Sequence, residues 1–378
     1  MSDSVLVRPV TSRRDLKAFV TFPWQVYRGD PLWVPPLISD RMAALDRSRG
    51  PFFKDADVSL LAARRDGRVI GTIAAFVDRA RVRHTSRSEG GFGFFEVIQD
   101  YEAARHLLQA GTEWLRSRGM SSVRGPTSFG DNDWPGVLIE GRDFPPAMME
   151  AHTPEYYPEF LERFGMQKDH DLYAWRATLE QVGKELESAS DIAHVAEAAR
   201  RTGAFTVRGV RLDRWPEEVE IIRELFNDTL AFIPDAVPAG EEEFRGLADQ
   251  MKPFLDPALA LIAEADGKPV GYCVMIPDTN QVLARLNGRL FPFNVLKVRR
   301  YIREIDVVSF KLMGVRKQYQ RRGLDALLLV EALTAMRDRG YKWLDGSLTS
   351  ELNPLINLLA KGRGAERYKQ YRLYRMDL

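Results

Sequence analysis

Residues 307–330 read Val307-Val-Ser-Phe-Lys-Leu-Met-Gly-Val-Arg-Lys-Gln-Tyr-Gln-Arg-Arg-Gly-Leu-Asp-Ala-Leu-Leu-Leu-Val330. The stretch begins with β-branched and apolar residues that favour a strand, passes through a short basic loop, and continues into an amphipathic helix. The first amides of a helix have no partner within it, and the helix dipole there attracts anions. Gly323 would let a ligand approach the main chain, and Arg321 and Arg322 add positive charge. The loop is therefore predicted to bind a pyrophosphate.

An internal repeat extends this pattern over the whole chain. Residues 60–77 and 259–276 each predict a hairpin, with turns at Asp66-Gly67 and Asp266-Gly267. In both halves an amphipathic helix that ends at a glycine follows, and then a short strand, a further helix, a glycine and a last strand. Three matching pieces in the same order predict an α/β fold of two tandem units. Each unit is expected to hold a mixed, mostly antiparallel twisted sheet flanked by helices.

The repeat also sets the expected domain bounds. We expect a first unit at residues 1–180, a polar, helix-forming linker at 181–204, and a second unit at 205–378. A length of 378 residues fits two domains. The first unit has the acidic segment Gln99-Asp100-Tyr-Glu102 where the second has its basic loop. Acidic side chains would repel phosphate, so one cofactor site is expected, in the second unit.

Composition excludes several classes of function. Lys and Arg number 54 against 53 Asp and Glu, so the chain lacks the basic excess that binds nucleic acid. The one cysteine, Cys273, cannot form an internal disulfide or a thiolate zinc cluster, and the five histidines are dispersed, so no metal is expected. The N-terminus lacks the apolar core of a signal peptide, and no window is apolar enough to span a membrane. A cytoplasmic protein is expected; the oligomeric state is left open.

The basic loop and its surroundings resemble the GNAT acyltransferase superfamily. In that superfamily the loop motif Gln/Arg-x-x-Gly-x-Gly/Ala, between a strand and a helix, grips the pyrophosphate of an acyl-coenzyme A. Gln320-Arg-Arg-Gly323 occupies this place here, and Asn353 follows at the next helix. The resemblance covers about residues 259–375 and implies acetyl-CoA or another acyl-CoA as co-substrate, without a metal. It assigns to the cofactor site Met313, Val315, Gln318, Gln320, Arg321, Arg322, Gly323, Leu324, Asp325, Ala326 and Asn353.

The sequence departs from the superfamily pattern in two places. The last motif position is Asp325 instead of Gly or Ala, with Ala326 one residue later, and an acidic side chain sits badly beside phosphate. The tyrosine that often protonates the leaving thiolate, seven residues after Asn353, is replaced by Ala360. Tyr368, Tyr371 and Tyr374 lie further on, in a predicted strand, so none of them inherits the role by position. These departures support an alternative: a catalytically silent module that binds acyl-CoA or holds a partner.

Two regions are candidates for the acceptor side. Glu304 and Asp306 lie on one face at the start of the predicted strand, where either could act as general base toward an amine. The alternative for both is a solvated strand end or a salt bridge. The second region is the long irregular segment at residues 125–157, rich in polar, methionine and aromatic residues. Structured loops beyond strand ends often carry function, although a packed connection between domains is an equal alternative.

The leading expectation is an acyl-CoA-dependent acyltransferase, in which an amine acceptor attacks the thioester directly while the backbone near Met313 and Val315 holds the carbonyl. Acetyl is the default acyl group. Residues 280–303 interleave basic and apolar residues, which is typical of a segment that lies on an anionic membrane, or of a solvated insertion. A longer acyl chain and a lipid amine would also fit, as in bacterial ceramide-synthase-like and other lipid N-acyltransferases. An aminoacyl-tRNA-dependent transferase is a further alternative, which the neutral charge disfavours.

Overall fold

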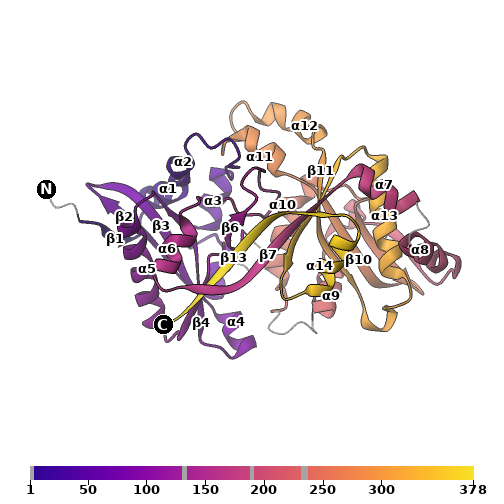
Figure 1. Cartoon of the computed structure of the whole chain (residues 1–378), viewed down its shortest axis with the longest axis horizontal. Helices are drawn as coiled ribbons and strands as arrows, with labels where there is room; N and C mark the ends of the chain where they lie inside the picture. The colour runs from indigo at the N-terminus through magenta and orange to yellow at the C-terminus, as the bar shows by residue number, and fades with distance from the viewer. Residues whose placement is uncertain (1–3, 130–133, 188–190, 231–236) are drawn as a thin grey trace.

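The computed structural model describes residues 4–129, 134–187, 191–230 and 237–378. In these residues a single sheet of thirteen strands runs along the molecule, flanked by helices (Figure 1). The first half contributes strands β1 (Leu6–Pro9), β2 (Ala56–Arg65), β3 (Arg68–Asp78), β4 (Glu89–Val97), β5 (Ser122–Gly125), β6 (Val137–Glu140) and β7 (Gln167–Thr178). Its helices are α1 (Arg13–Thr21), α2 (Pro23–Val26), α3 (Ile38–Ala44), α4 (Arg79–Thr85), α5 (Tyr101–Arg116) and α6 (Tyr157–Arg163), with the 3₁₀ turn η1 (Pro51–Lys54).

The second half repeats this order. Its strands are β8 (Thr206–Gly209), β9 (Ala260–Ala265), β10 (Lys268–Pro277), β11 (Val307–Val315), β12 (Trp343–Ser350) and β13 (Glu366–Asp377). Its helices are α7 (Leu179–Glu187), α8 (Asp191–Arg201), α9 (Trp215–Leu230), α10 (Glu241–Met251), α11 (Asn280–Leu286), α12 (Val295–Arg303), α13 (Leu324–Asp338) and α14 (Pro354–Gly362). Short 3₁₀ turns lie at η2 (Leu212–Arg214), η3 (Lys252–Phe254) and η4 (Lys317–Tyr319).

The two predicted hairpins are present, and their turns have the same backbone conformation. Asp66 and Gly67 have φ values of 51° and 77°, and Asp266 and Gly267 have 50° and 73°. A turn with positive φ at both central residues matches the right-handed twist of its flanking strands, and Asp-Gly adopts it readily. The sequence prediction of two tandem α/β units with mixed, mostly antiparallel sheets is confirmed.

The two halves exchange their closing strands. β7, from the first sequence repeat, pairs with β12 of the second, and β13, from the second, pairs with β5 of the first. β7 and β13 also pair with each other along nine register positions, which joins the two sheets into one. Figure 1 shows both strands crossing the middle of the molecule. Each half of the sheet is therefore completed by a strand from the other repeat.

Helices on each half cover separate apolar cores. In the first half α5 places Leu107, Leu108 and Leu115, all fully buried, against β2 to β4. In the second half α13 places Leu324 and Leu328 against β9 to β11. The segment predicted as a linker, 181–204, forms most of α7 and all of α8, which pack on α13, while residues 188–190 lie outside the described part of the chain. Among the described helices, none has both the length and the apolar character needed to cross a bilayer.

Candidate active site

The loop between β11 and α13 carries a row of free amides. Arg321 and Gly323 both have left-handed backbone conformations, with φ of 60° and 76°, and α13 begins directly after them. Within the described structure, no hydrogen bond engages the amides of residues 321–326, since the first bond back into the loop runs from Leu327 N to Gly323 O. Consecutive unpaired amides at a helix start are the arrangement that binds phosphate groups.

β11 has an open edge that leads from this loop into the molecule. It pairs in parallel with β12 only from Val307 to Ser309, although it continues beside β10 as far as Val315. On its other side β12 pairs with β7 from Trp343 to Ser350, with a register shift after Gly346. Residues 310–315, where a thioester carbonyl was predicted to be held, therefore have no ladder partner on the β12 side among the described residues. An unpaired strand edge offers amides and carbonyls to an extended ligand.

A buried polar cluster occupies the point where β11 and β12 separate. Ser309 Oγ donates to Asp345 Oδ2 at 2.8 Å, and these two residues form the last β11–β12 pair. Tyr368 Oη, on β13, lies 3.1 Å from Asp345 Oδ1 and 3.3 Å from Glu150 Oε1, so its proton bridges two carboxyls. Lys311 Nζ donates to the carbonyl of Met148 at 2.7 Å and lies 3.9 Å from Asp345. Three strands and the segment 125–157 thus meet in one cluster.

The charges of this cluster are unequal. Three buried carboxyls, on Glu150, Asp278 and Asp345, face the ammonium groups of Lys369, which is buried, and of Lys311, which is partly exposed. Burial, reinforced by the charge of Asp345, raises the pKa of Glu150 and of Asp278 to about 7. Burial also lowers the pKa of Lys369 to about 8. Groups that exchange protons near neutral pH are what general acid–base catalysis needs.

Comparison with known proteins identifies the relatives of this chain. No family model matches the sequence. The chain is 32% identical over 379 residues to Protein YghO of Escherichia coli (strain K12), which covers 99% of this chain and 95% of that protein. It is 31% identical over 382 residues to the bacterial ceramide synthase of Caulobacter vibrioides (strain NA1000 / CB15N), covering 98% and 97%. The chain belongs to the family of these two proteins.

Solved structures give the fold of this family. A tandem GNAT protein from the clavulanic acid biosynthesis pathway superposes with a TM-score of 0.58 at 13% identity, over 99% of this chain and 98% of that one. A GCN5-related N-acetyltransferase from Sphaerobacter thermophilus superposes with a TM-score of 0.51 at 14% identity, over 100% and 96%. The predicted resemblance is confirmed at the level of the fold: the chain has the fold of tandem GNAT proteins.

Within this GNAT fold, the predicted loop residues fall into two groups. Leu324 and Ala326 are buried in the core under α13, so they can offer only their amides. Those with solvent-exposed side chains are Gln318, Gln320, Arg321, Arg322 and Asp325. Asp325 sits in the first helical turn, where the helix dipole favours a carboxylate, and its side chain points out of the core.

The structure adds a second reason for the glycine at position 323. A Cβ atom there would lie 2.9 Å from Val195 and 3.2 Å from Ala199, both on α8. Close packing against α8 therefore requires glycine in addition to the left-handed φ. Gln320 fixes the loop by donating from Nε2 to the carbonyl of Val315 at 3.0 Å.

The other predicted site residues lie in ordinary structural settings. Asn353 is the N-cap of α14, where its side chain accepts from the amide of Ile356 at 3.4 Å. Met313 is about one-third exposed on the open part of β11. In the described structure, no hydrogen bond links the side chain of Asn353 or of Met313 to the basic loop. Their role toward acyl-CoA stays a prediction.

Glu304 and Asp306 are held in surface ion pairs. Glu304 caps α12 and bonds to Arg285 and Arg300, and these hydrogen bonds keep its pKa below the usual value. Asp306 accepts from Gln281 Nε2 at 2.8 Å and lies 3.3 Å from Lys342. These contacts match the alternative stated for both residues, a salt bridge at the start of the strand in place of a catalytic base. No bond in the described structure links either carboxylate to the buried cluster, and their role as bases stays a prediction.

The cluster could have been found only in part from the sequence. Ser309 and Lys311 alternate on one face of an otherwise apolar strand, which was a usable signal. Glu150 lies in the segment 125–157 proposed as a second site region, although residues 130–133 of that segment lie outside the described structure. Asp278, Asp345 and Lys369 come from separate strand ends, and nothing local in the sequence links them.

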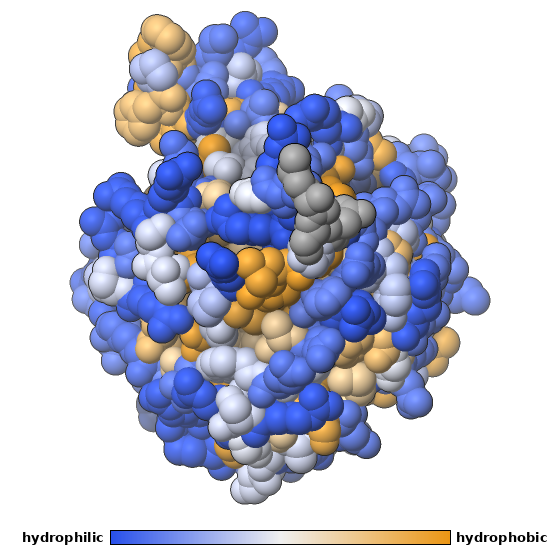
Figure 2. Space-filling view, turned by 90° about the vertical axis from the view of Figure 1, so that its left-hand side faces the viewer, coloured by the Kyte–Doolittle hydropathy of each residue, from blue (hydrophilic) through white to orange (hydrophobic). Residues whose placement is uncertain are grey.

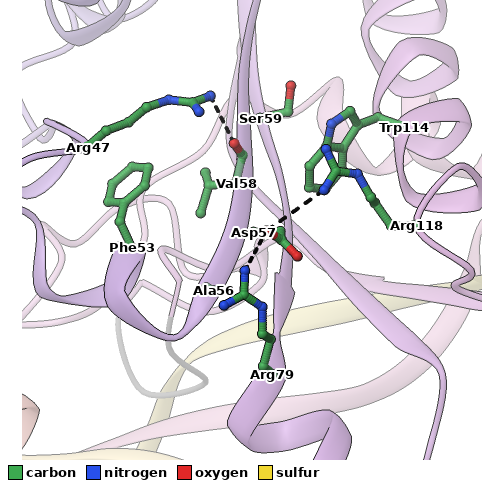
Figure 3. Close-up of a pocket in the computed structure, with 9 residues that line it drawn as sticks. All are labelled: Arg47, Phe53, Ala56, Asp57, Val58, Ser59, Arg79, Trp114 and Arg118. Atoms are coloured by element: carbon green, nitrogen blue, oxygen red, sulfur yellow. Dashed lines mark hydrogen bonds and ion pairs between the residues drawn. The ribbon is translucent and has the colours of Figure 1, made fainter.

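A cavity of about 300 Å³ opens elsewhere, at the outer edge of the first half (Figure 3). There Arg47 donates to the carbonyl of Val58 at 3.0 Å, while Arg79 and Arg118 converge on Asp57 at 2.7 and 3.8 Å. β1 reaches only to Leu61, so this part of β2 is a free sheet edge, and the arginines protect it. Among the described residues, no group of His, Cys, Asp or Glu is arranged to hold a metal ion.

Proposed function

We propose that this chain is an acyl-CoA-dependent N-acyltransferase that joins a long acyl group to the amine of a lipid acceptor. The observation that carries the proposal is the order of three features along β11: free amides at residues 321–326, the open edge at 310–315, and the buried cluster at Ser309 and Lys311. This order suits a pyrophosphate, an extended arm and a reacting thioester. The relative named a ceramide synthase supports a lipid amine as acceptor, because a ceramide contains an amide-linked acyl chain.

The reaction requires two proton movements. The amine nitrogen attacks the thioester carbonyl carbon, a C–N bond forms, the C–S bond breaks, and coenzyme A leaves as a thiol. One N–H proton must leave the nitrogen, and we assign it to Glu150, which exchanges protons near neutrality. The thiolate must gain a proton, and we assign Tyr368 as donor. The proton that Glu150 takes from the amine then passes to Tyr368 across their 3.3 Å contact. Burial and the neighbouring carboxylates raise the pKa of Tyr368 well above the usual value, so its hydroxyl stays protonated. Tyr368 would thus serve in place of the residue lost at Ala360.

An assay of thiol release from acyl-CoA distinguishes the proposed transferase from the alternative of a catalytically silent module. Wild-type protein is mixed with acyl-CoA of C2 to C18 chain length and a panel of amines, and thiol release is followed with amide formation. We expect release with long acyl chains and a long-chain amino alcohol. Arg322→Glu should raise the KM for acyl-CoA at least tenfold, whereas Arg8→Ala, a matched exposed arginine on β1, should not. Saturable coenzyme A binding without thiol release from any pair would favour the silent module.

We further propose that a docking segment, residues 289–303, brings the enzyme to a membrane surface that holds its acceptor. Phe291, Phe293 and Leu296 are 71%, 75% and 82% exposed. Figure 2 shows an apolar projection at the top of the molecule, the level at which Figure 1 places α11 and α12. Exposed basic side chains surround these residues: Arg289, Lys297, Arg299, Arg300 and Arg303. Apolar insertion ringed by positive charge suits an anionic leaflet, and we place the enzyme in the cytoplasm.

Vesicle sedimentation tests the docking segment. The triple variant Phe291→Ser, Phe293→Ser, Leu296→Ser should lose most of its binding to vesicles that contain anionic lipid. Thiol release with soluble short-chain substrates should stay within twofold of wild type, because Leu290, Val298 and Ile302 of the segment still pack against the apolar cluster that contains Val282 and Leu286 of α11. A control replaces Leu358, an exposed leucine on α14, with serine. Equal vesicle binding by the triple variant and wild type would overturn the docking proposal.

A further inference from the structure

The first half has an opening like that in the second half, but with different contents. β4 pairs in parallel with β5 only from Glu89 to Gly91, as β11 does with β12. One further backbone bond runs from Thr127 N to Phe92 O, and the two segments then separate. No basic loop follows: Asp100 caps α5 directly and holds Arg65 in an ion pair. A cavity of about 90 Å³ lies in this opening. Its apolar lining includes Phe19, Val20, Trp33, Val34, Phe94 and Phe95.

His152, one of the residues that line this cavity, has a buried hydrogen-bond acceptor without a partner in the described structure. Its side chain is only 7% exposed, and its Nε2 lies 2.7 Å from Asp30 Oδ2, so Nε2 carries the proton. Nδ1 then holds a lone pair. Burial lowers the pKa of His152, so the ring is neutral at physiological pH. Nδ1 is buried and has no hydrogen-bond partner in the described structure. A buried acceptor without a partner costs free energy and calls for a donor from a ligand.

Glu96 supplies a second acceptor in the same wall. It is half-buried and accepts from Tyr157 Oη at 2.7 Å, and Tyr27 Oη lies 3.0 Å away. Burial raises the pKa of Glu96 to about 7. Tyr27 Oη also lies 2.8 Å from the carbonyl oxygen of His152, so this one hydroxyl contacts both Glu96 and His152. Arg41, the cation in the lining, stacks on Trp134 with its guanidinium 3.9 Å from the ring centre.

The cavity adjoins the buried cluster of the second half. Glu150 lines the cavity and also accepts from Tyr371 Oη at 3.1 Å, next to its contact with Tyr368. Asn280 of α11 lines it as well and donates to the carbonyl of Pro146 at 2.9 Å. One residue, Glu150, thus belongs both to this cavity and to the site at which β11 and β12 separate.

We propose that this first-half cavity binds the head group of the amine acceptor. The inference rests on the proposed function and assigns a second substrate site to it. Two acceptors, His152 Nδ1 and the Glu96 carboxyl, match the N–H and O–H donors of an amino alcohol, whereas a fatty acid would bring a carboxylate against them. The aromatic and aliphatic lining matches the first part of an alkyl chain. The second half would then hold acyl-CoA, and the first half would present the amine toward Glu150.

Steady-state kinetics of the full-length protein separate the two substrate sites. His152→Gln keeps a donor that can reach Asp30 but replaces the ring acceptor at Nδ1 with an amide oxygen at a different position, and Glu96→Gln removes the carboxylate. Both variants should raise the KM for sphinganine, a long-chain amino alcohol, at least tenfold. The KM for acyl-CoA should stay within twofold of the wild-type value. Arg322→Glu should show the opposite pattern. His106→Gln, on the exposed face of α5, is the control and should change neither constant.

A second measurement uses the wild-type chain, so that misfolding of a variant cannot decide the outcome. A photoreactive long-chain amino alcohol should label residues 92–97 or 146–153, and free sphinganine should suppress the labelling, whereas palmitate should not. If both His152→Gln and Glu96→Gln had an amine KM within twofold of wild type, and the probe labelled residues outside these two ranges, the inference would be overturned. Thiol release by the same protein would still support the proposed function. Specific labelling in a protein that releases no thiol would support the amphiphile site and reject the transferase.

Discussion

Glu150 illustrates how burial makes an ordinary carboxyl a group that exchanges protons at neutral pH. Its side chain accepts from the amide of Ala147 and from two tyrosines, yet it lies among more carboxyls than ammonium groups. Removing three carboxylates from water beside the ammonium groups of Lys311 and Lys369 disfavours full ionisation. One proton therefore stays on the cluster up to about pH 7, and the titration belongs to the coupled group.

The pH dependence of the reaction tests Glu150. A base must be deprotonated to act, so kcat/KM for the amine should rise with pH through a step near 7. Glu150→Gln should lower kcat about 100-fold or more and remove that step. Glu155→Gln, a nearby exposed carboxylate, serves as the control. A Glu150→Gln enzyme that kept both its rate and the step would eliminate Glu150 as the base.

The stability of the protein should depend on pH through Glu96. Its pKa is about 7 in the folded chain and near 4.5 when unfolded, so folding favours the protonated form. The stabilisation is complete below pH 4.5 and falls as pH rises to 7, by roughly 3 kcal/mol at most. Glu96→Gln carries no titrating proton, so its free energy of unfolding should fall less than that of wild type between pH 5 and 7. Urea unfolding at a series of pH values measures the free energy of unfolding of both proteins. If it changed equally with pH in Glu96→Gln and in wild type, Glu96 would not be the group responsible.

At the scale of elements, α8 and the basic loop act as one unit. Gly323→Ala places a methyl group at a left-handed φ and 2.9 Å from Val195. Gly340→Ala meets the same φ, 74°, but no atom within 4 Å, so it isolates the conformational cost of about 1 kcal/mol. Gly323→Ala should lower the free energy of unfolding further and weaken coenzyme A binding. Calorimetry would measure the free energy of unfolding and the coenzyme A affinity of both variants. Equal values for the two variants would show that α8 moves to accommodate the methyl group at position 323.

The elements predicted from sequence are those defined by local pattern. The Asp-Gly hairpins, the glycine-ended helices and the loop at 320–323 each follow from residues close in the chain. The exchange of β7 and β13 could not be predicted, because a closing strand has the same sequence whether it pairs within its own repeat or across. The same holds for the cluster, since Asp278, Asp345 and Lys369 are far apart in the sequence and meet only in the folded chain. Alternation placed Glu304 and Asp306 on one face, but it carried no information about the basic partners that hold them.

At the scale of the whole molecule, the strand exchange makes each half depend on the other. β13 completes the sheet of the first half, yet it follows the second half in sequence, and β7 does the reverse. Neither half can close its sheet without the other's strand, and each core packs against a sheet that contains or adjoins it. The two proposed substrate sites share Glu150 at this junction. The coupling that holds the halves together would therefore also align the amine with the thioester.

Matched core substitutions test this coupling. Leu107 on α5 and Leu328 on α13 are both completely buried, one in each core. Replacing either with alanine should cost about 2–5 kcal/mol. Because the halves share β7 and β13, each variant should shift one cooperative transition, seen at the same urea concentration by far-UV circular dichroism and by tryptophan fluorescence. Leu352→Ala, exposed by 74%, is the control. Two separate transitions in Leu328→Ala, with the first half still folded, would mean that β13 remains in place without its own core and that the exchange does not unite the halves.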